Sequence, residues 1–272
     1  MRTLMAAVFC ALSMSTAQTA VAQTTFHVKE FDFDKGSWVF ETINAGMNGF
    51  PVRADRVRSG HELGLGYGVT SWWLPKILLS FETPVDDSLH VQRVLFENIF
   101  KLKNLAEGKD GFGVAWFQSV EGALRRDETN ATLFGPILTG QLGKFSASVN
   151  PFLEKTFGQN RENGMSFVWA VQGRYEIADK IKIGIESYGT VPEIGGRSTG
   201  AGTQHRFGPV LIVETELGGM AHGGRHGTAA GHSVKTAGSK EPAHAEIEFG
   251  VLFGTTDATP DLTGKVNMHI KF

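Results

Sequence analysis

Apolar and polar residues alternate one by one along most of this chain, and segments with the period of a helix are rare after residue 22. In the segment 61–69, Leu63, Leu65 and Tyr67 share one face, while Glu62 and three glycines share the other. A period of two predicts a β-strand with one apolar and one polar face. The same pattern recurs in eleven further segments: 37–43, 73–82, 91–100, 112–121, 132–142, 145–157, 166–177, 181–191, 206–217, 245–254 and 262–272.

These segments are long for strands, and the links between them differ in length. Strands of about 9–12 residues match the span of a tilted strand that crosses a bilayer. Short turns such as 143–144 and 178–180 alternate with longer links such as 122–131, 158–164 and 192–204. Short turns at one end and long loops at the other are typical of outer-membrane barrels. We therefore predict an all-β fold, an antiparallel up-and-down transmembrane β-barrel of about twelve strands.

The segment 44–60 is a further long link of this kind, and we expect it to be a loop. One link does not fit the scheme, because 218–244 is long where strict alternation requires a short turn. Either one strand is miscounted or this segment is an insertion, and we expect it to be a flexible loop rich in glycine and histidine.

The first 22 residues predict a secretory signal peptide. Arg2 is followed by an apolar core from Leu4 to Met14, and Ala20-Val21-Ala22 forms a cleavage site before Gln23. The single cysteine, Cys10, lies in this segment, so residues 23–272 would form one barrel domain without cysteine.

The length, charge and composition of the chain exclude several classes of protein. The chain has 272 residues, a formal net charge of -2 and 41% hydrophobic residues, which resembles a soluble globular protein. No later stretch is apolar for 18 residues, which argues against a helical membrane protein. The near-neutral charge offers no basic surface for nucleic acid.

A soluble barrel or sandwich would share the alternation, but two features favour the membrane form. Glycine, with 34 residues, falls repeatedly on the polar face, where a narrow lumen needs small residues beside long charged ones. Aromatic residues gather on the apolar face near the strand ends, as in the aromatic girdles of membrane barrels. They are Trp38, Trp72, Trp73, Trp116, Trp169 and Tyr175.

The end of the chain, V-N-M-H-I-K-F, alternates up to a terminal Phe272. It resembles the last strand of Gram-negative outer-membrane barrels, in which the terminal aromatic residue belongs to the signal read by the assembly machinery. The resemblance implies the cell outer membrane as the location, with outer-membrane lipid and the barrel-assembly machinery as partners.

A wider resemblance rests on four pieces of sequence: H-E-L-G-L-G-Y-G-V-T-S-W-W, F-E-N-I-F, H-R-F-G-P-V-L and G-T-T-D-A-T-P-D. With these pieces the chain resembles proteobacterial outer-membrane barrels of the type associated with the MetA pathway of phenol degradation. The resemblance implies a transporter-like role and provides no catalytic residues.

The polar face carries the charged residues that we expect to line the lumen. Acids exceed bases among them, which favours passage or binding of a small cation or polar neutral solute. The alternative is a filled barrel whose paired charges satisfy the interior without conductance and which serves as a structural or surface-binding protein. The expected lining residues are Glu62, Lys76, Glu82, Arg93, Glu97, Glu121, Glu154, Arg174, Glu176, Lys182, Glu186, Arg206, Glu214, Glu216, Glu246, Glu248 and Lys265.

Two kinds of chemistry remain as weaker interpretations. His222, His226 and His232 could bind a transition metal, but their spacing fits no rigid site, and we expect neither a resident metal nor a cofactor. His61, His205 and Ser198 lie near expected loop ends, where a lipid hydrolase would place its catalytic groups. Serine and histidine are common enough to fall near loop ends by chance, so we do not expect an enzyme.

Overall fold

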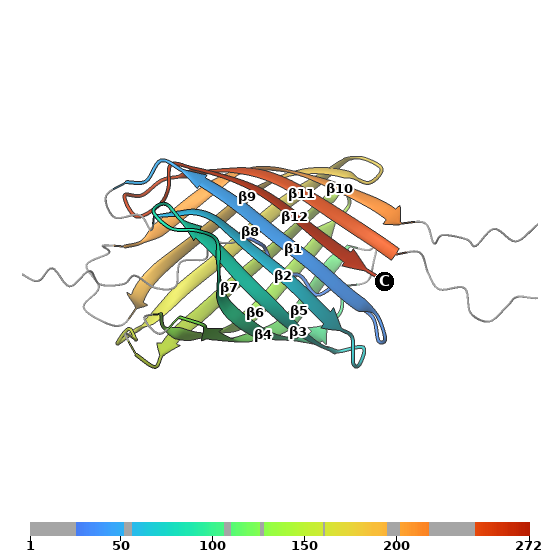
Figure 1. Ribbon diagram of the computed structural model, residues 1–272. Coiled ribbons are helices and arrows are strands. Elements are labelled where there is room, and N and C mark those ends of the chain that lie inside the picture. The colour runs from blue at the N-terminus through green and yellow to red at the C-terminus, as the bar shows by residue number, and fades with distance from the viewer. Residues whose placement is uncertain are drawn as a thin grey trace, which may run out of the picture.

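The computed structural model describes residues 26–51, 56–105, 110–125, 128–159, 161–194, 202–217 and 243–272. These residues form a closed barrel in which every strand pairs antiparallel with its neighbours in sequence, and the last strand pairs with the first (Figure 1). The strands are β1 (Trp38–Asn48), β2 (Val57–Tyr67), β3 (Trp73–Pro84), β4 (His90–Lys103), β5 (Gly111–Ala123), β6 (Asn130–Leu142), β7 (Phe145–Phe157), β8 (Met165–Ala178), β9 (Ile181–Ile194), β10 (Gln204–Leu217), β11 (Ala243–Gly254) and β12 (Leu262–Lys271). The predicted fold and the count of twelve strands are confirmed.

In the part of the chain that is described, no helix is long and apolar enough to cross a membrane.

The barrel has two distinct ends. β1 begins and β12 ends at one of them, which we call the terminal end, and the opposite one is the far end (Figure 1). The tight turns Gly143-Lys144 and Asp179-Lys180 lie at the terminal end. All six connections at the far end are longer than these.

The expected link at 44–60 was wrong at both of its boundaries. β1 continues to Asn48, which pairs with Leu262 of β12, and β2 begins at Val57. Asn44, Gly46 and Asn48 resemble a turn in sequence, but the ladder with β12 satisfies their backbone groups.

The long link after β10 does not disturb the strand count. β10 ends at Leu217 and β11 begins at Ala243, and these two strands are paired neighbours at the terminal end. The segment is therefore an insertion between consecutive strands, which was one of the two alternatives. His222, His226 and His232 lie outside the described residues.

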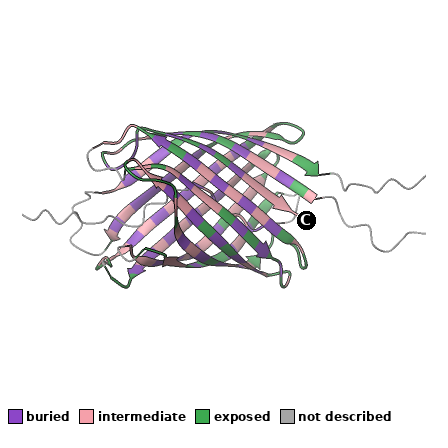
Figure 2. Cartoon of the chain, in the orientation of Figure 1, coloured by how far each residue is buried: buried purple, intermediate pink, exposed green. Residues whose placement is uncertain are grey.

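The wall has its apolar face outside and its charged face inside. Buried and more exposed residues alternate along the strands (Figure 2). On the outer face, Ile185 is 65% exposed and Phe96 is 50% exposed, whereas Glu97 and Lys265 inside are 2% and 3% exposed. A soluble barrel would bury its apolar face, so this arrangement is that of a barrel surrounded by lipid.

The lipid-facing assignment can be tested by placing a charge on the outer wall. We predict that Phe96→Lys, in the middle of β4, destabilises the barrel in a bilayer by about 2–4 kcal/mol. Leu89→Lys, in the exposed connection before β4, is the control and should cost about 0–1 kcal/mol. Denaturant unfolding in lipid vesicles measures both values, and equal small costs would contradict a lipid-facing wall.

Candidate functional site: the occupied lumen

The segment before β1 runs inside the barrel instead of leaving it. Asp34 and Gly36 lie at the terminal end, where the backbone N–H of Gly36 donates to the carbonyl of Gly68 at 2.7 Å. From there the chain passes inward to Phe26, whose ring packs edge-on against Tyr188 of β9 with centroids 5.5 Å apart. We call residues 26–34 the lumen segment. The pattern of the sequence did not predict that residues 26–34 lie inside the barrel.

Apolar side chains anchor the lumen segment at two points. Phe31 and Phe33 belong to a cluster with inward residues of β3 to β8, among them Phe117. Phe26 and Val28 belong to a second cluster that includes Tyr188. Burying four such side chains is worth about 1.5–3 kcal/mol each before the entropy of ordering the chain is subtracted.

The wall also binds the backbone of the lumen segment. Asn150 of β7 accepts from the N–H of Lys29 at 2.7 Å and donates to the Lys29 carbonyl at 3.0 Å. At its inner end the carbonyl of Phe26 accepts from Asn267 at 2.9 Å and from Lys265 at 3.2 Å. These bonds supply partners for backbone groups that would otherwise be unpaired within the barrel.

Four charges balance one another where the lumen segment meets β1, β3 and β4. Lys76 Nζ lies 2.8 Å from carboxylate oxygens of both Glu41 and Glu97. Lys29 Nζ lies 2.7 Å from the other oxygen of Glu97 and 3.9 Å from Glu41. The wall alone would hold two carboxylates against one ammonium, so Lys29 completes the neutral set. We call these residues the Lys29 cluster.

Further ion pairs hold the segment between Lys29 and the terminal end. Glu30 pairs with Arg174 of β8 and accepts from the Ser148 hydroxyl at 2.9 Å. Nearer the terminal end, Lys271 Nζ lies 2.9 Å from Asp32 and 3.4 Å from Asp34.

A second buried network lies on the opposite side of the lumen and belongs to the wall. The Lys265 ammonium is shared between Glu186 and Glu248, and Glu248 is 2.5 Å away. Gln172 donates to both carboxylates, at 2.5 and 2.6 Å. Arg206 lies beside this network, with its guanidinium carbon 4.0 Å from the Phe26 ring centre.

The remaining residues that the sequence placed on the lumen face are divided between the two ends. Glu62, Arg93, Glu121 and Glu154 line a cavity toward the far end, and Glu82 lies there beside His90 at 3.7 Å. At the terminal end Lys182 pairs with Glu214, and Lys180 pairs with Glu216 at 2.8 Å. Glu176 is the register partner of Lys182, and Glu246 lies 3.8 Å from Arg174.

Inward glycines make room for the long charged side chains. A β-carbon on Gly66 would lie 2.5 Å from Cγ of Lys76, and one on Gly250 would lie 2.8 Å from Cε of Lys265. The lysine stems therefore cross the neighbouring strands at glycine positions, as the glycine excess on the polar face predicted.

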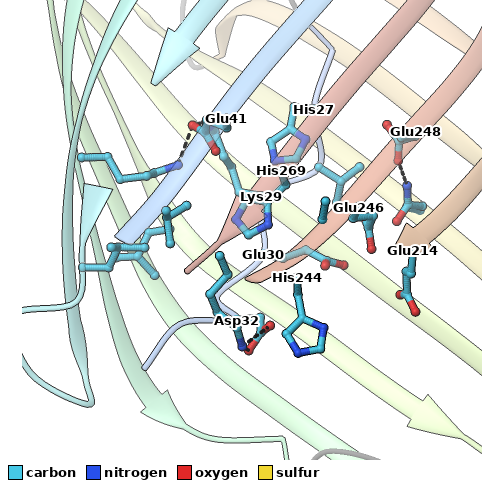
Figure 3. A pocket seen from close by; sticks show the side chains of 18 of the residues that line it. His27, Lys29, Glu30, Asp32, Glu41, Glu214, His244, Glu246, Glu248 and His269 are labelled. Carbon is cyan, nitrogen blue, oxygen red and sulfur yellow. Dashed lines mark hydrogen bonds and ion pairs between the residues drawn. The ribbon is translucent and has the colours of Figure 1, made fainter. Parts of the chain in front are cut away.

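The lumen segment separates two cavities. One has a volume of about 290 Å³ and lies toward the terminal end, among Glu30, Glu246 and His269 (Figure 3). The other has about 60 Å³ and lies toward the far end. His27 and Lys29 line both cavities, and no other residue is common to the two. The described residues therefore leave polar space on both sides of the segment but a barrier between them.

Several residues of this site were missed by sequence reasoning. Glu41 shares the inward face of β1 with Val39 and Ile43, and the alternation could have identified it. Lys29 and Glu30 carry no such signal, because a short segment before the first strand is equally compatible with a position outside the barrel.

The structure describes two of the three residues weighed for a hydrolase. His61 and His205 lie on β2 and β10, and each contacts a serine other than Ser198. Ser198 lies outside the described residues.

No protein-family model and no curated protein matches this sequence. Among solved structures, the COG4313 outer membrane channel from Pseudomonas putida F1 is similar, with a TM-score of 0.55 and 14% identity over 90% of this chain and 99% of that one. The outer membrane protein OprD from Pseudomonas aeruginosa is also found, with a TM-score of 0.38 and 10% identity over 90% of this chain and 66% of that one. The first of these likenesses shows a shared fold, and this chain accordingly has the fold of an outer-membrane β-barrel.

Proposed function

We propose that this protein is an outer-membrane channel for small polar solutes, closed in the described state by its own lumen segment. One observation carries the proposal: two polar cavities, of about 290 and 60 Å³, meet only at His27 and Lys29 of that segment. Moving the segment would join them. The similar barrel from Pseudomonas putida is named an outer membrane channel, which agrees with this function.

The orientation follows from the connections. Bacterial outer-membrane barrels place short turns in the periplasm and longer loops outside. The tight turns Gly143-Lys144 and Asp179-Lys180 therefore put the terminal end in the periplasm and the far end outside the cell. In this proposal residues 1–22 direct export, Phe272 contributes to recognition by the assembly machinery, and lipid surrounds the wall.

The charges of the lumen favour cations and neutral polar solutes. Of the seventeen charged residues that the sequence placed on the lumen face, eleven are glutamates and six are lysines or arginines. Rings of carboxylates select cations in pores because they lower the electrostatic cost of a passing positive charge. The Lys29 ammonium is the cation that the lumen segment contributes.

The second candidate function is a filled barrel that conducts nothing and serves as a structural or surface-binding protein. The apolar anchors Phe26, Phe31 and Phe33 favour it, because they occupy the lumen in the manner of a protein core. The two functions differ in whether the segment can leave, and conductance measures that directly.

Deletion of residues 26–34 is expected to open the barrel. The wall is closed by its own strand ladder, so the deleted protein should still fold and show heat-dependent mobility on gels. We predict that its single-channel conductance in planar bilayers rises at least several-fold above that of the complete protein. A folded deletion variant that conducts no better than the complete protein would rule out the channel and favour the filled barrel.

Lys29→Met should weaken closure without removing the segment. The change removes the Lys29 ammonium, so that within the Lys29 cluster Lys76 is the one ammonium left to balance Glu41 and Glu97. Breaking a buried ion pair in this way costs about 3–5 kcal/mol of stability. Since about 1.4 kcal/mol corresponds to a factor of ten, we predict at least a tenfold rise in open probability. Lys180→Met, which breaks an exposed pair with Glu216, is the matched control and should leave the open probability unchanged.

The open barrel should prefer cations. In a KCl gradient, the reversal potential of the deletion variant should shift toward the value for potassium, because acidic side chains dominate the lumen. Replacing Glu62, Glu121 and Glu154 together by glutamine should reduce that preference, since all three line the far cavity. An anion-selective reversal potential would contradict the predicted solute class.

A further inference from the structure

Three polar side chains form a hydrogen-bonded row on the outer, lipid-facing side of the barrel. Ser59 and His61 are two residues apart on β2, and Asn44 is the cross-strand partner of His61 on β1. His61 Nε2 lies 3.1 Å from Ser59 Oγ, and His61 Nδ1 lies 2.9 Å from Asn44 Oδ1. Leu63 and Leu65 continue the same face of β2 toward the terminal end, and both are exposed.

The contacts of Asn44 fix the proton on the histidine ring. Asn44 Nδ2 donates to the carbonyl of Val266 at 3.2 Å, so the amide oxygen faces His61. That oxygen can only accept, and it therefore takes the proton of Nδ1. Nε2 is left without a proton and accepts from the Ser59 hydroxyl. This is the tautomer in which a histidine serves as the base for a serine nucleophile.

An apolar hollow of about 660 Å³ adjoins the serine on the outer wall, and all three polar residues line it. Its floor contains Gly46, which is paired with both Ser59 and Gly264. No heavy atom lies within 4 Å of the position of a β-carbon on either glycine, so the space above them is open. Exposed Leu211, Phe249 and Val266 are among the residues that line the hollow.

We propose that Ser59, His61 and Asn44 hydrolyse carboxylic esters of membrane lipids, with the acyl chain lying in this hollow. Ser59 Oγ attacks the ester carbonyl while His61 Nε2 takes its proton. The C–O bond to the lipid alcohol then breaks, and the alcohol leaves with that proton. Water, deprotonated by the same nitrogen, attacks the acyl-serine, and the fatty acid departs as Ser59 recovers its proton. Asn44 orients the ring through Nδ1.

The backbone next to Ser59 departs from the regular ladder. The pairing of β2 with β3 shifts register between Val57 and Ser59, which leaves Arg58 as an extra residue. Bulges of this kind are over-represented beside active sites, where they re-aim a side chain.

A second serine–histidine pair on the outer wall provides an internal control. Ser187 Oγ lies 3.0 Å from His205 Nε2, and the other ring nitrogen contacts the Thr255 hydroxyl at 2.8 Å. This pair has no amide behind the histidine, and the His205 ring stacks on Phe207 with centroids 6.1 Å apart. We expect Ser187 to be unreactive.

The position of the row identifies the lipids that can reach it. Ser59 is the third residue of β2 from the far end, which the proposed orientation places at the outer leaflet. Long-chain acyl esters occur there in phospholipid and in the lipid A part of lipopolysaccharide. Both present the same ester chemistry, so separate substrates must distinguish them.

The first experiment locates the nucleophile. The complete protein in detergent micelles is treated with a long-chain alkyl fluorophosphonate, and peptide mass spectrometry identifies the modified residue. We expect label on Ser59, its loss in Ser59→Ala, and full labelling in Ser187→Ala. Label on Ser187, or no label on either serine, would overturn the proposal.

The second experiment measures turnover. Vesicles of phosphatidylethanolamine and phosphatidylglycerol, and separately micelles of lipopolysaccharide, are incubated with the complete protein and assayed for free fatty acid. Ser59→Ala and His61→Ala should each reduce release about a hundredfold or more. Release from either substrate supports the activity and identifies its source, whereas no release, or release that Ser59→Ala leaves unchanged, overturns it.

A third variant tests the hollow independently of the hydrogen-bonded row. Gly46→Leu adds a side chain into open space on the outer wall, so the barrel should fold as before. We expect labelling by the long-chain fluorophosphonate to fall at least tenfold while labelling by a short-chain one persists. Equal labelling by both probes would contradict an acyl site in the hollow.

Discussion

The pairing of Lys29 with Glu41 and Glu97 is the interaction on which the interior of this barrel depends. A wall that alternates strictly must direct every second side chain inward, and many of those side chains are glutamates. Buried carboxylates are costly unless cations and hydrogen-bond donors surround them. Lys76 supplies one ammonium, and the lumen segment supplies the other. The segment is therefore part of the electrostatic structure of the wall as well as a barrier within it.

The same contacts determine how closure and stability are related. The segment is held by buried rings, by the two bonds of Asn150 and by ion pairs, and all of these must be lost when it moves. The wall, in contrast, closes through its own backbone ladder, since β12 pairs with β1. In the proposed channel, segment release and barrel unfolding are therefore separate events, and a change that weakens closure need not weaken the barrel.

The outer face follows a different constraint. Residues that face lipid gain nothing from charge or polarity, so Ser59, His61 and Asn44 satisfy one another in a closed row. Two of them share a face because they are two apart on one strand, and the third joins them through strand register. Small residues at Gly46 and Gly264 leave the adjoining hollow open. Three polar groups and an apolar hollow therefore coincide at this place on the outer wall.

The alternation of apolar and polar residues was enough to predict the architecture, because a period of two repeated in twelve segments leaves few folds other than a closed antiparallel barrel. It also showed which residues share a face, so Glu97, Glu186 and Lys265 could be assigned to one side from their spacing alone. Which inward residues meet depends on the folded barrel, since register and closure bring β1 beside β12 and bring Glu41 to Lys76. Folding also places residues 26–34 inside and joins Asn44 to His61. Contacts of this kind join residues that are far apart in the sequence, and the pattern within one strand contains no information about them.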